Sequence, residues 1–157
     1  MTNAIRTQTS TALDGKRKPV ISGLGATYQL DDTMSGAIIA LDRAAGIVLT
    51  LPTCLVGLTY EFITTVSVTT NSYKVITNRT ATEFLMGEII SDDTDTSDAI
   101  ALFPANGTTH VAITMAGTTT GGLVGSHFRI TCISATQWLI EGVNKGSSTV
   151  ATPFATS

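Results

Sequence analysis

The sequence predicts an all-β protein, either an antiparallel β-sandwich, a jelly-roll or a β-barrel-like single domain, with an extended N-terminal arm. Three observations predict this fold class. Thr occupies 29 of the 157 positions, and together with Val and Ile it supplies the β-branched side chains that suit strands. The chain has 14 Gly available for turns. Short runs alternate apolar and polar residues with a period of two, and no helical pattern lies between them.

Composition also excludes several classes of protein. A length of 157 residues indicates one domain, and 43% hydrophobic residues with a mean hydropathy of +0.29 indicate a chain that folds. No apolar run reaches the roughly 18 residues of a spanning helix, and residues 1–11 lack the apolar core of a signal peptide. The net charge of −3 argues against general attraction to phosphate. We therefore expect neither a membrane nor a nucleic acid as partner.

The chain divides into three predicted parts. Residues 1–25 are predicted to be an extended arm, residues 26–143 an antiparallel β domain, and residues 144–157 a flexible tail. The arm carries four of the nine basic residues on an otherwise acidic chain, so it could dock on a negatively charged neighbour. A frayed, solvated terminus explains the same composition equally well. The four basic residues are Arg6, Lys16, Arg17 and Lys18.

The first strands follow from the alternation. Residues 37–41 are apolar throughout, which indicates a strand buried on both faces. In 47–51 the odd positions share one apolar face, and Pro52 ends the ladder because it has no N–H to donate. The longest candidate, 58–66, alternates apolar residues with Thr and Glu, as a half-buried strand does. The candidates in this half are 28–31, 37–41, 47–51, 58–66 and 73–77.

The middle of the chain contains a turn and a predicted hairpin. Residues 80–83 match a helix capping box, but Gly87 follows too soon for a full helix, so we interpret the segment as a turn. The run 99–103 is a strand candidate. The Asn106-Gly107 pair then favours a tight hairpin, because both residues accept positive φ angles. We expect this hairpin to join 99–103 to 108–115.

The last third has the clearest pattern. Residues 118–122 are predicted to form a flexible Thr-Gly loop. The alternating runs 128–132 and 137–143 flank the turn at 134–136 and predict an antiparallel hairpin. Trp138, the one tryptophan, is expected to anchor the core, and the alternative is an exposed ring that stacks on a sugar.

No set of residues in the sequence predicts an active site. His110 and His127 both fall on the polar faces of their strands, which favours exposed positions over catalysis. Cys54 and Cys132 are too distant in sequence to be a zinc-type pair. They are expected to be buried thiols, with a disulfide between them as the alternative. We expect no catalytic residue, no enzyme activity and no cofactor.

Two loops bear a limited likeness to ligand-binding sequences. Asp92, Asp93, Asp95 and Asp98 offer hard oxygen ligands within one loop, but the EF-hand glycine and twelfth-position Glu are missing. A solvated loop is therefore favoured, and no metal is expected. Residues 121–125 are rich in Gly, but neither a Walker lysine nor a helix follows.

Four segments resemble a known family. Residues 35–52 (SGAIIALDRAAGIVLTLP), 56–62 (VGLTYEF), 122–125 (GLVG) and 137–142 (QWLIEG) are similar to segments of small structural proteins of tailed bacteriophages. Together they cover about a fifth of the chain. The chain resembles the capsid decoration, or head cement, proteins of these phages.

This resemblance implies a virion protein on the outer surface of an icosahedral phage head. Such a protein is made in the host cytoplasm, binds the major capsid protein, stabilises the capsid and commonly forms a homotrimer. The family has no catalytic residues to transfer. If the arm is the clamp, deleting residues 1–25 removes capsid binding and leaves the body folded. By charge and position, the expected capsid contacts are Arg6, Lys16, Arg17 and Lys18.

A second interpretation is a carbohydrate- or receptor-binding module of a phage tail fibre. Its site would consist of exposed aromatic rings beside the acidic loop, with Trp138, Tyr60 and Tyr73 as the candidates.

Overall fold

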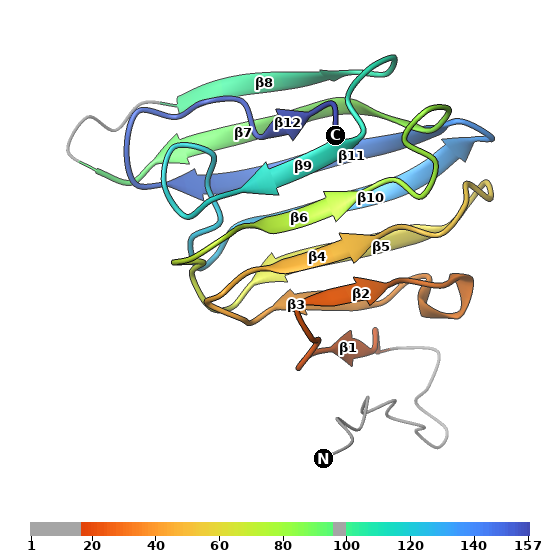
Figure 1. The fold of residues 1–157 in the computed structure, drawn as a ribbon, viewed down its shortest axis with the longest axis horizontal. Helices are drawn as coiled ribbons and strands as arrows, with labels where there is room; N and C mark the ends of the chain where they lie inside the picture. The colour runs from red at the N-terminus through yellow and green to blue at the C-terminus, as the bar shows by residue number, and fades with distance from the viewer. Residues whose placement is uncertain (1–16, 96–99) are drawn as a thin grey trace.

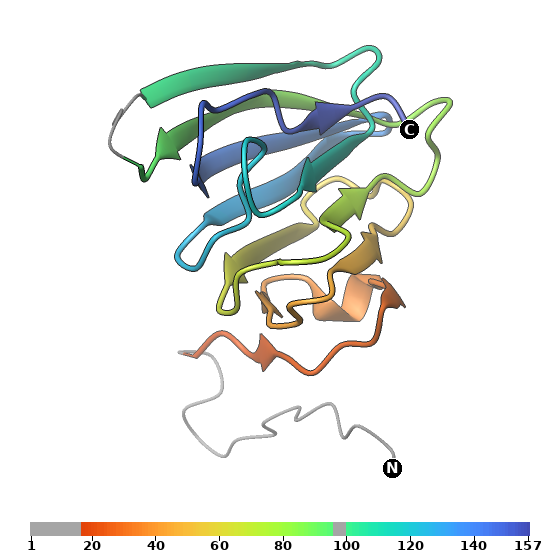
Figure 2. The same cartoon turned by 60° about the vertical axis from the view of Figure 1, so that its left-hand side comes forward.

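The computed structural model describes residues 17–95 and 100–157, which form two β-sheets packed face to face (Figures 1 and 2). The seven-stranded sheet has the order β1 (Val20–Ile21), β3 (Ile38–Leu41), β5 (Thr59–Thr64), β10 (His127–Ser134), β11 (Gln137–Gly146), β7 (Phe84–Asp93) and β8 (Ile100–Asn106). The five-stranded sheet has the order β12 (Phe154–Ala155), β9 (Ala112–Met115), β6 (Tyr73–Ile76), β4 (Ile47–Thr50) and β2 (Thr27–Gln29). One 3₁₀ turn, η2, spans Asp32–Met34. The predicted all-β sandwich is confirmed.

The sheets are mixed, so the prediction of a purely antiparallel body is wrong. The first six strands alternate between the two sheets, so that β1, β3 and β5 lie in one and β2, β4 and β6 in the other. All neighbours within these two sets are parallel. The reason is geometric, because a chain that crosses to the opposite sheet after every strand returns to the first sheet in its original direction.

The predicted C-terminal hairpin is confirmed and fills the centre of the larger sheet. Strands β10 and β11 pair antiparallel from His127↔Val143 to Ser134↔Gln137. On its other side β10 pairs antiparallel with β5, and β11 pairs parallel with β7 over ten positions. The hairpin therefore joins the two parts of the sheet that precede it in sequence.

Side chains from the inner faces of both sheets form one core. The Phe62 and Phe128 rings are stacked with centroids 4.9 Å apart, and the Tyr60 and Trp138 centroids lie 6.3 Å apart. Trp138 is fully buried, which confirms its predicted role as a core anchor. The odd positions of 47–51 are buried together, as predicted from the alternation.

The predicted hairpin at Asn106-Gly107 is wrong. The chain does turn there, because Asn106 Oδ1 accepts hydrogen bonds from the N–H groups of Thr108, Thr109 and His110. However, β8 ends in the seven-stranded sheet and β9 begins in the five-stranded sheet. The side chain of Asn106 thus accepts from backbone N–H groups that would otherwise donate to the partner strand of a hairpin. The turn carries the chain across the sandwich to the other sheet.

Gly87 does not end a segment, because β7 runs through it. Gly87 has a φ of 109°, and a Cβ added there would lie 2.2 Å from the Ile140 carbonyl oxygen. Only glycine tolerates this close approach of β7 to β11. The strand then continues to Asp93, so the first two residues of the predicted acidic loop belong to β7.

Both terminal segments are more structured than predicted. Residues 1–16 of the predicted arm lie outside the described residues. Within 17–25, Ile21 and Leu24 are both 6% exposed and belong to the core. The tail prediction from residue 144 is also wrong, because β11 extends to Gly146 and the later residues form β12 on the edge of the smaller sheet. Its Phe154 is buried because its apolar ring reaches the core.

Candidate functional site

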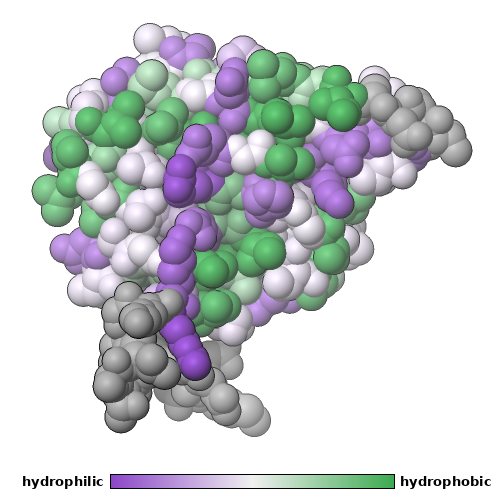
Figure 3. Space-filling model, turned by 180° about the vertical axis from the view of Figure 1, so that it is seen from behind, coloured by the Kyte–Doolittle hydropathy of each residue, from purple (hydrophilic) through white to green (hydrophobic). Residues whose placement is uncertain are grey.

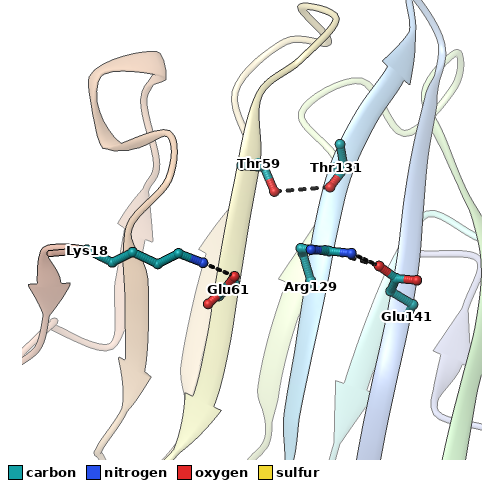
Figure 4. Close-up of polar contacts among 6 residues, drawn as sticks. All are labelled: Lys18, Thr59, Glu61, Arg129, Thr131 and Glu141. Atoms are coloured by element: carbon teal, nitrogen blue, oxygen red, sulfur yellow. Dashed lines mark hydrogen bonds and ion pairs between the residues drawn. The ribbon is translucent and has the colours of Figure 1, made fainter. Parts of the chain in front are cut away.

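A row of charged side chains crosses the outer face of the seven-stranded sheet. The register aligns Glu61 of β5, Arg129 of β10, Glu141 of β11 and Glu88 of β7 as successive cross-strand neighbours. Lys18, which precedes β1, reaches across to Glu61 and forms an ion pair with it. Figure 4 shows this pair beside the pair of Arg129 with Glu141. The sheet therefore aligns five charges from five segments of the chain, and we call them the charged row.

The charges of this row contribute little to stability. The side chains of Lys18 and Glu61 are 54% and 32% exposed, and exposed ion pairs are worth about 0–1 kcal/mol. The hydrogen bond that Arg129 donates to the Glu141 carboxylate raises the pKa of Arg129. Glu88 lies beside Glu141, a carboxylate of like charge, and is exposed. The charged row therefore has one more carboxylate than cations, and it presents this excess negative charge to a binding partner.

A second row runs parallel to the charged row, two residues later on β5, β11 and β7 and two residues earlier on β10. We call it the apolar row, because four of its five residues are apolar. Its members are Ile63, His127, Val143, Ile90 and Leu102, which the register aligns across β5, β10, β11, β7 and β8. Ile90 and Leu102 are 43% and 54% exposed. A shallow depression of about 610 Å³ lies between the two rows. In Figure 3 a hydrophilic band crosses this face with hydrophobic residues on both sides of it.

The chemistry of this face suits contact with another protein. Exposed branched apolar side chains gathered on a rigid sheet are costly to hydrate, and a burying partner would recover that free energy. Flanking charges provide orientation and register more than affinity. Thr59 and Thr131 add a hydroxyl pair 3.0 Å apart on the opposite side of the charged row (Figure 4).

The edge strand β8 is protected from pairing with further strands. Gly107 N–H donates to the Leu85 carbonyl, which places the odd positions of β8 toward β7. The even positions face outward, and there Asn106 N–H donates to His110 Nδ1. Pro104 occupies another outward position and has no N–H to offer. Because proline and a used donor blunt this edge, the face of the sheet is a better interaction surface than its edge.

The predicted capsid-contact residues lie near this face where they are described. Lys18 joins the charged row through Glu61, and Arg17 is exposed just before it. Arg6 and Lys16 lie outside the described residues. The structure therefore brings the last two residues of the basic cluster to the β1 side of the seven-stranded sheet.

The two histidines differ in their surroundings. His127 is exposed on the apolar row, and its Nδ1 lies 3.0 Å from the Gly125 carbonyl oxygen. His110 is only partly exposed, because its ring stacks on Phe154 with centroids 5.5 Å apart. The prediction of an exposed position is confirmed for His127 and wrong for His110, whose apolar ring face is covered by the C-terminal segment.

The acidic residues do not converge. Asp92 and Asp93 are neighbours in β7, so their side chains point to opposite faces, and Asp93 is 1% exposed. Asp93 accepts a hydrogen bond from Asp95 N–H, and Asp98 lies outside the described residues. Among residues 17–95 and 100–157, no group of three His, Cys, Asp or Glu side chains could hold a metal ion.

The aromatic site predicted for a tail-fibre module is wrong. Trp138, Tyr60 and Tyr73 are all fully buried, so none can stack on a sugar. Their polar atoms have partners inside the protein, since Tyr60 Oη donates to the Asp31 carbonyl and Tyr73 Oη to the Val66 carbonyl. Large rings bury the most apolar area, and the core uses all three.

A buried polar cluster that the sequence did not predict lies just before the start of β7. Glu83 is fully buried, and its carboxylate accepts hydrogen bonds from Cys54 N–H at 3.0 Å and Trp138 Nε1–H at 3.4 Å. The capping-box match at 80–83 predicted only a turn and nothing about the burial of this Glu. No feature of the sequence points to a buried one, because its donors come from distant segments.

Comparisons with known proteins give no match. No family model matches the chain, and no curated protein and no solved structure is detectably similar to it. No helix in the described part of the chain is long and apolar enough to cross a membrane.

Proposed function

We propose that this chain is a structural protein of a bacteriophage virion that binds the outer surface of the icosahedral capsid and stabilises it. It acts by binding alone, without catalysis. Its partners are the major capsid protein and further copies of itself, with which it forms a homotrimer. The resemblance of four segments to capsid decoration proteins suggests this class, and the outer face of the seven-stranded sheet is the observation that carries it.

The apolar row supports self-association of the body. Ile63, Ile90 and Leu102 remain exposed after the core is complete, and a second copy of the chain would cover them. The charged row alternates in sign from Lys18 to Glu141. Alternating charges let one copy present both a cation and a carboxylate to a neighbouring copy.

The N-terminal arm supports capsid attachment. Its sequence includes Arg6 and Lys16 and continues into Arg17 and Lys18, of which Lys18 reaches Glu61 of the larger sheet. Weak contacts of this kind become strong in total when a symmetric lattice repeats them. The segment to delete in a test is 1–16, because deleting 1–25 would also remove the buried Ile21 and Leu24.

Co-sedimentation with phage heads tests the proposal. Heads of the source phage, stripped of small surface proteins, are mixed with purified protein and pelleted. We expect saturable binding at a ratio to the major capsid protein that the lattice determines. The variant lacking 1–16 should keep the melting temperature of the full chain and lose binding. Absence of binding by the full chain contradicts the proposed function, and full binding by the truncated chain contradicts the role of the arm.

A matched pair of variants tests the apolar row. Ile90→Asp places a charge on this row, and Val48→Asp places one on the outer face of the five-stranded sheet, at positions 43% and 37% exposed. Both changes should alter the free energy of unfolding by less than about 1 kcal/mol. Light scattering after size-exclusion chromatography should show monomers for Ile90→Asp and the unchanged oligomer for Val48→Asp. Equal oligomeric states in both variants would exclude the apolar row as the contact.

A further inference from the structure

We propose that Cys54 and Cys132 close into an intramolecular disulfide when the folded protein meets a low-molecular-weight disulfide such as oxidised glutathione. The bond would fasten the loop between β4 and β5 to the inner face of β10. This inference does not depend on capsid binding.

The backbone around both cysteines is already held in place. Cys132 N–H donates to the Leu58 carbonyl at 2.8 Å, and its carbonyl accepts from Gly57 N–H at 2.9 Å. On the loop, Cys54 N–H donates to the carboxylate of Glu83 at 3.0 Å. Two of these bonds fix the end of the loop to β10, and the third ties Cys54 to the residue that precedes β7. The loop that carries Cys54 is therefore held beside the strand that carries Cys132, as a disulfide between them requires.

The two thiols are free in the structure, and each perturbs the pKa of the other, so they lie close together. The Cys132 thiol donates a hydrogen bond to the Ser134 carbonyl at 3.1 Å. Cys132 is 1% exposed, whereas Cys54 is partly exposed on the loop. An oxidant from solution therefore reaches Cys54 first, and Cys132 is placed to attack it from inside.

The reaction balances as two thiol–disulfide exchanges. The Cys54 thiolate attacks one sulfur of the oxidised glutathione, which breaks its S–S bond, releases one glutathione thiolate and leaves a mixed disulfide on Cys54. The Cys132 thiolate then attacks the Cys54 sulfur, forms the internal S–S bond and releases the second glutathione thiolate. The protein loses two protons and two electrons, and one disulfide becomes two thiols.

Burial sets the rate of this reaction. Burial raises the pKa of both thiols above their ordinary value, so little thiolate is present at neutral pH. Since the thiolate is the nucleophile, the rate should rise about tenfold for each pH unit below that pKa. The cross-link would close a ring of roughly 80 residues and raise the melting temperature by on the order of 10 °C.

The test uses the full chain, incubated with millimolar oxidised glutathione at about pH 8.5. We expect DTNB titration after denaturation to fall from two free thiols to none and the intact mass to fall by two hydrogen atoms. Peptide mapping without reductant should find the 54–132 link. The melting temperature should rise and return to its initial value when dithiothreitol is added.

The Cys54→Ser variant is the control, because position 54 lies on the partly exposed loop at the margin of the core. It should show neither the link nor the rise in melting temperature. A folded protein that keeps both thiols, that stops at a glutathione adduct on Cys54, or that forms disulfides only between copies would overturn the inference.

Discussion

Among the described acidic side chains, Glu83 should contribute most to the stability of the fold. Replacing it with Ala leaves Cys54 N–H and Trp138 Nε1–H buried without an acceptor and opens a small cavity. We expect Glu83→Ala to lower the free energy of unfolding by about 3 kcal/mol. Urea unfolding followed by the fluorescence of Trp138 measures this loss.

Glu88→Ala is the matched control, because Glu88 is exposed on the charged row. Its free energy of unfolding should stay within about 0.5 kcal/mol of the unchanged protein. If the Glu83 and Glu88 variants unfold at the same urea concentration, the buried carboxylate does not hold the loop and Trp138 together.

At this scale the sequence predicts apolar residues better than polar ones. Alternation identifies Trp138 and Phe62 as inward-facing, because their own strands determine their faces. Glu83 escapes prediction because its burial depends on Trp138, which lies 55 residues away, and on Cys54 in another loop. A local pattern contains no information about such partners.

Among the elements, β12 depends most on a single side chain. Phe154 is 7% exposed and stacks on His110, while only two residues of β12 pair with β9. We expect Phe154→Ala to destabilise the protein by about 2 kcal/mol, less than a central Phe, because the edge can collapse locally. Amide hydrogen exchange should accelerate at Val111, whose N–H donates to the Ala155 carbonyl.

Thr156→Ala serves as the control for β12, because Thr156 is exposed beside the same strand. Its exchange rates should equal those of the unchanged protein. Unaltered protection of the Val111 amide in the Phe154 variant would mean that β12 is held by its backbone hydrogen bonds alone.

Strands could be predicted from the sequence, but their neighbours could not. The candidates 37–41, 47–51 and 58–66 overlap β3, β4 and β5 closely. A period of two specifies the two faces of a strand and contains no information about which sheet it joins. The same limit explains the error at Asn106-Gly107. It also explains why the charged row could not be predicted, because Glu61 and Arg129 become neighbours only when β10 pairs with β5.

For the whole molecule, burial of hydroxyls and thiols predicts loss of stability in alkaline solution. Burial raises the pKa of Tyr60 and Tyr73 above 10.0 and that of Cys54 and Cys132 above 9.0. The unfolded chain therefore loses these protons at a lower pH than the folded protein does. Because the unfolded state then binds fewer protons, the free energy of unfolding falls as pH rises. Melting temperatures should begin to decline near about pH 9 and fall more steeply above about pH 10.

The Tyr60→Phe variant separates the effect of the Tyr60 hydroxyl's titration on the melting temperature from the effect of its packing. This variant loses the hydrogen bond to the Asp31 carbonyl, so it should melt at a lower temperature at pH 7. It also lacks one titrating hydroxyl, so the decline of its melting temperature between about pH 9 and pH 11 should be shallower. A steeper decline than in the unchanged protein would contradict the assigned direction of the Tyr60 pKa.

The late position of the β10–β11 hairpin in the chain also affects how the protein folds during synthesis. Translation delivers β5 and β7 well before their respective partners β10 and β11, so the nascent chain carries two open strand edges and the uncovered ring of Phe62. Open edges and apolar surface are the features that lead to aggregation during folding. The larger sheet cannot close until the ribosome has passed Gly146, and a fragment ending before His127 would be a substrate for chaperones and proteases instead of a smaller working version of the protein.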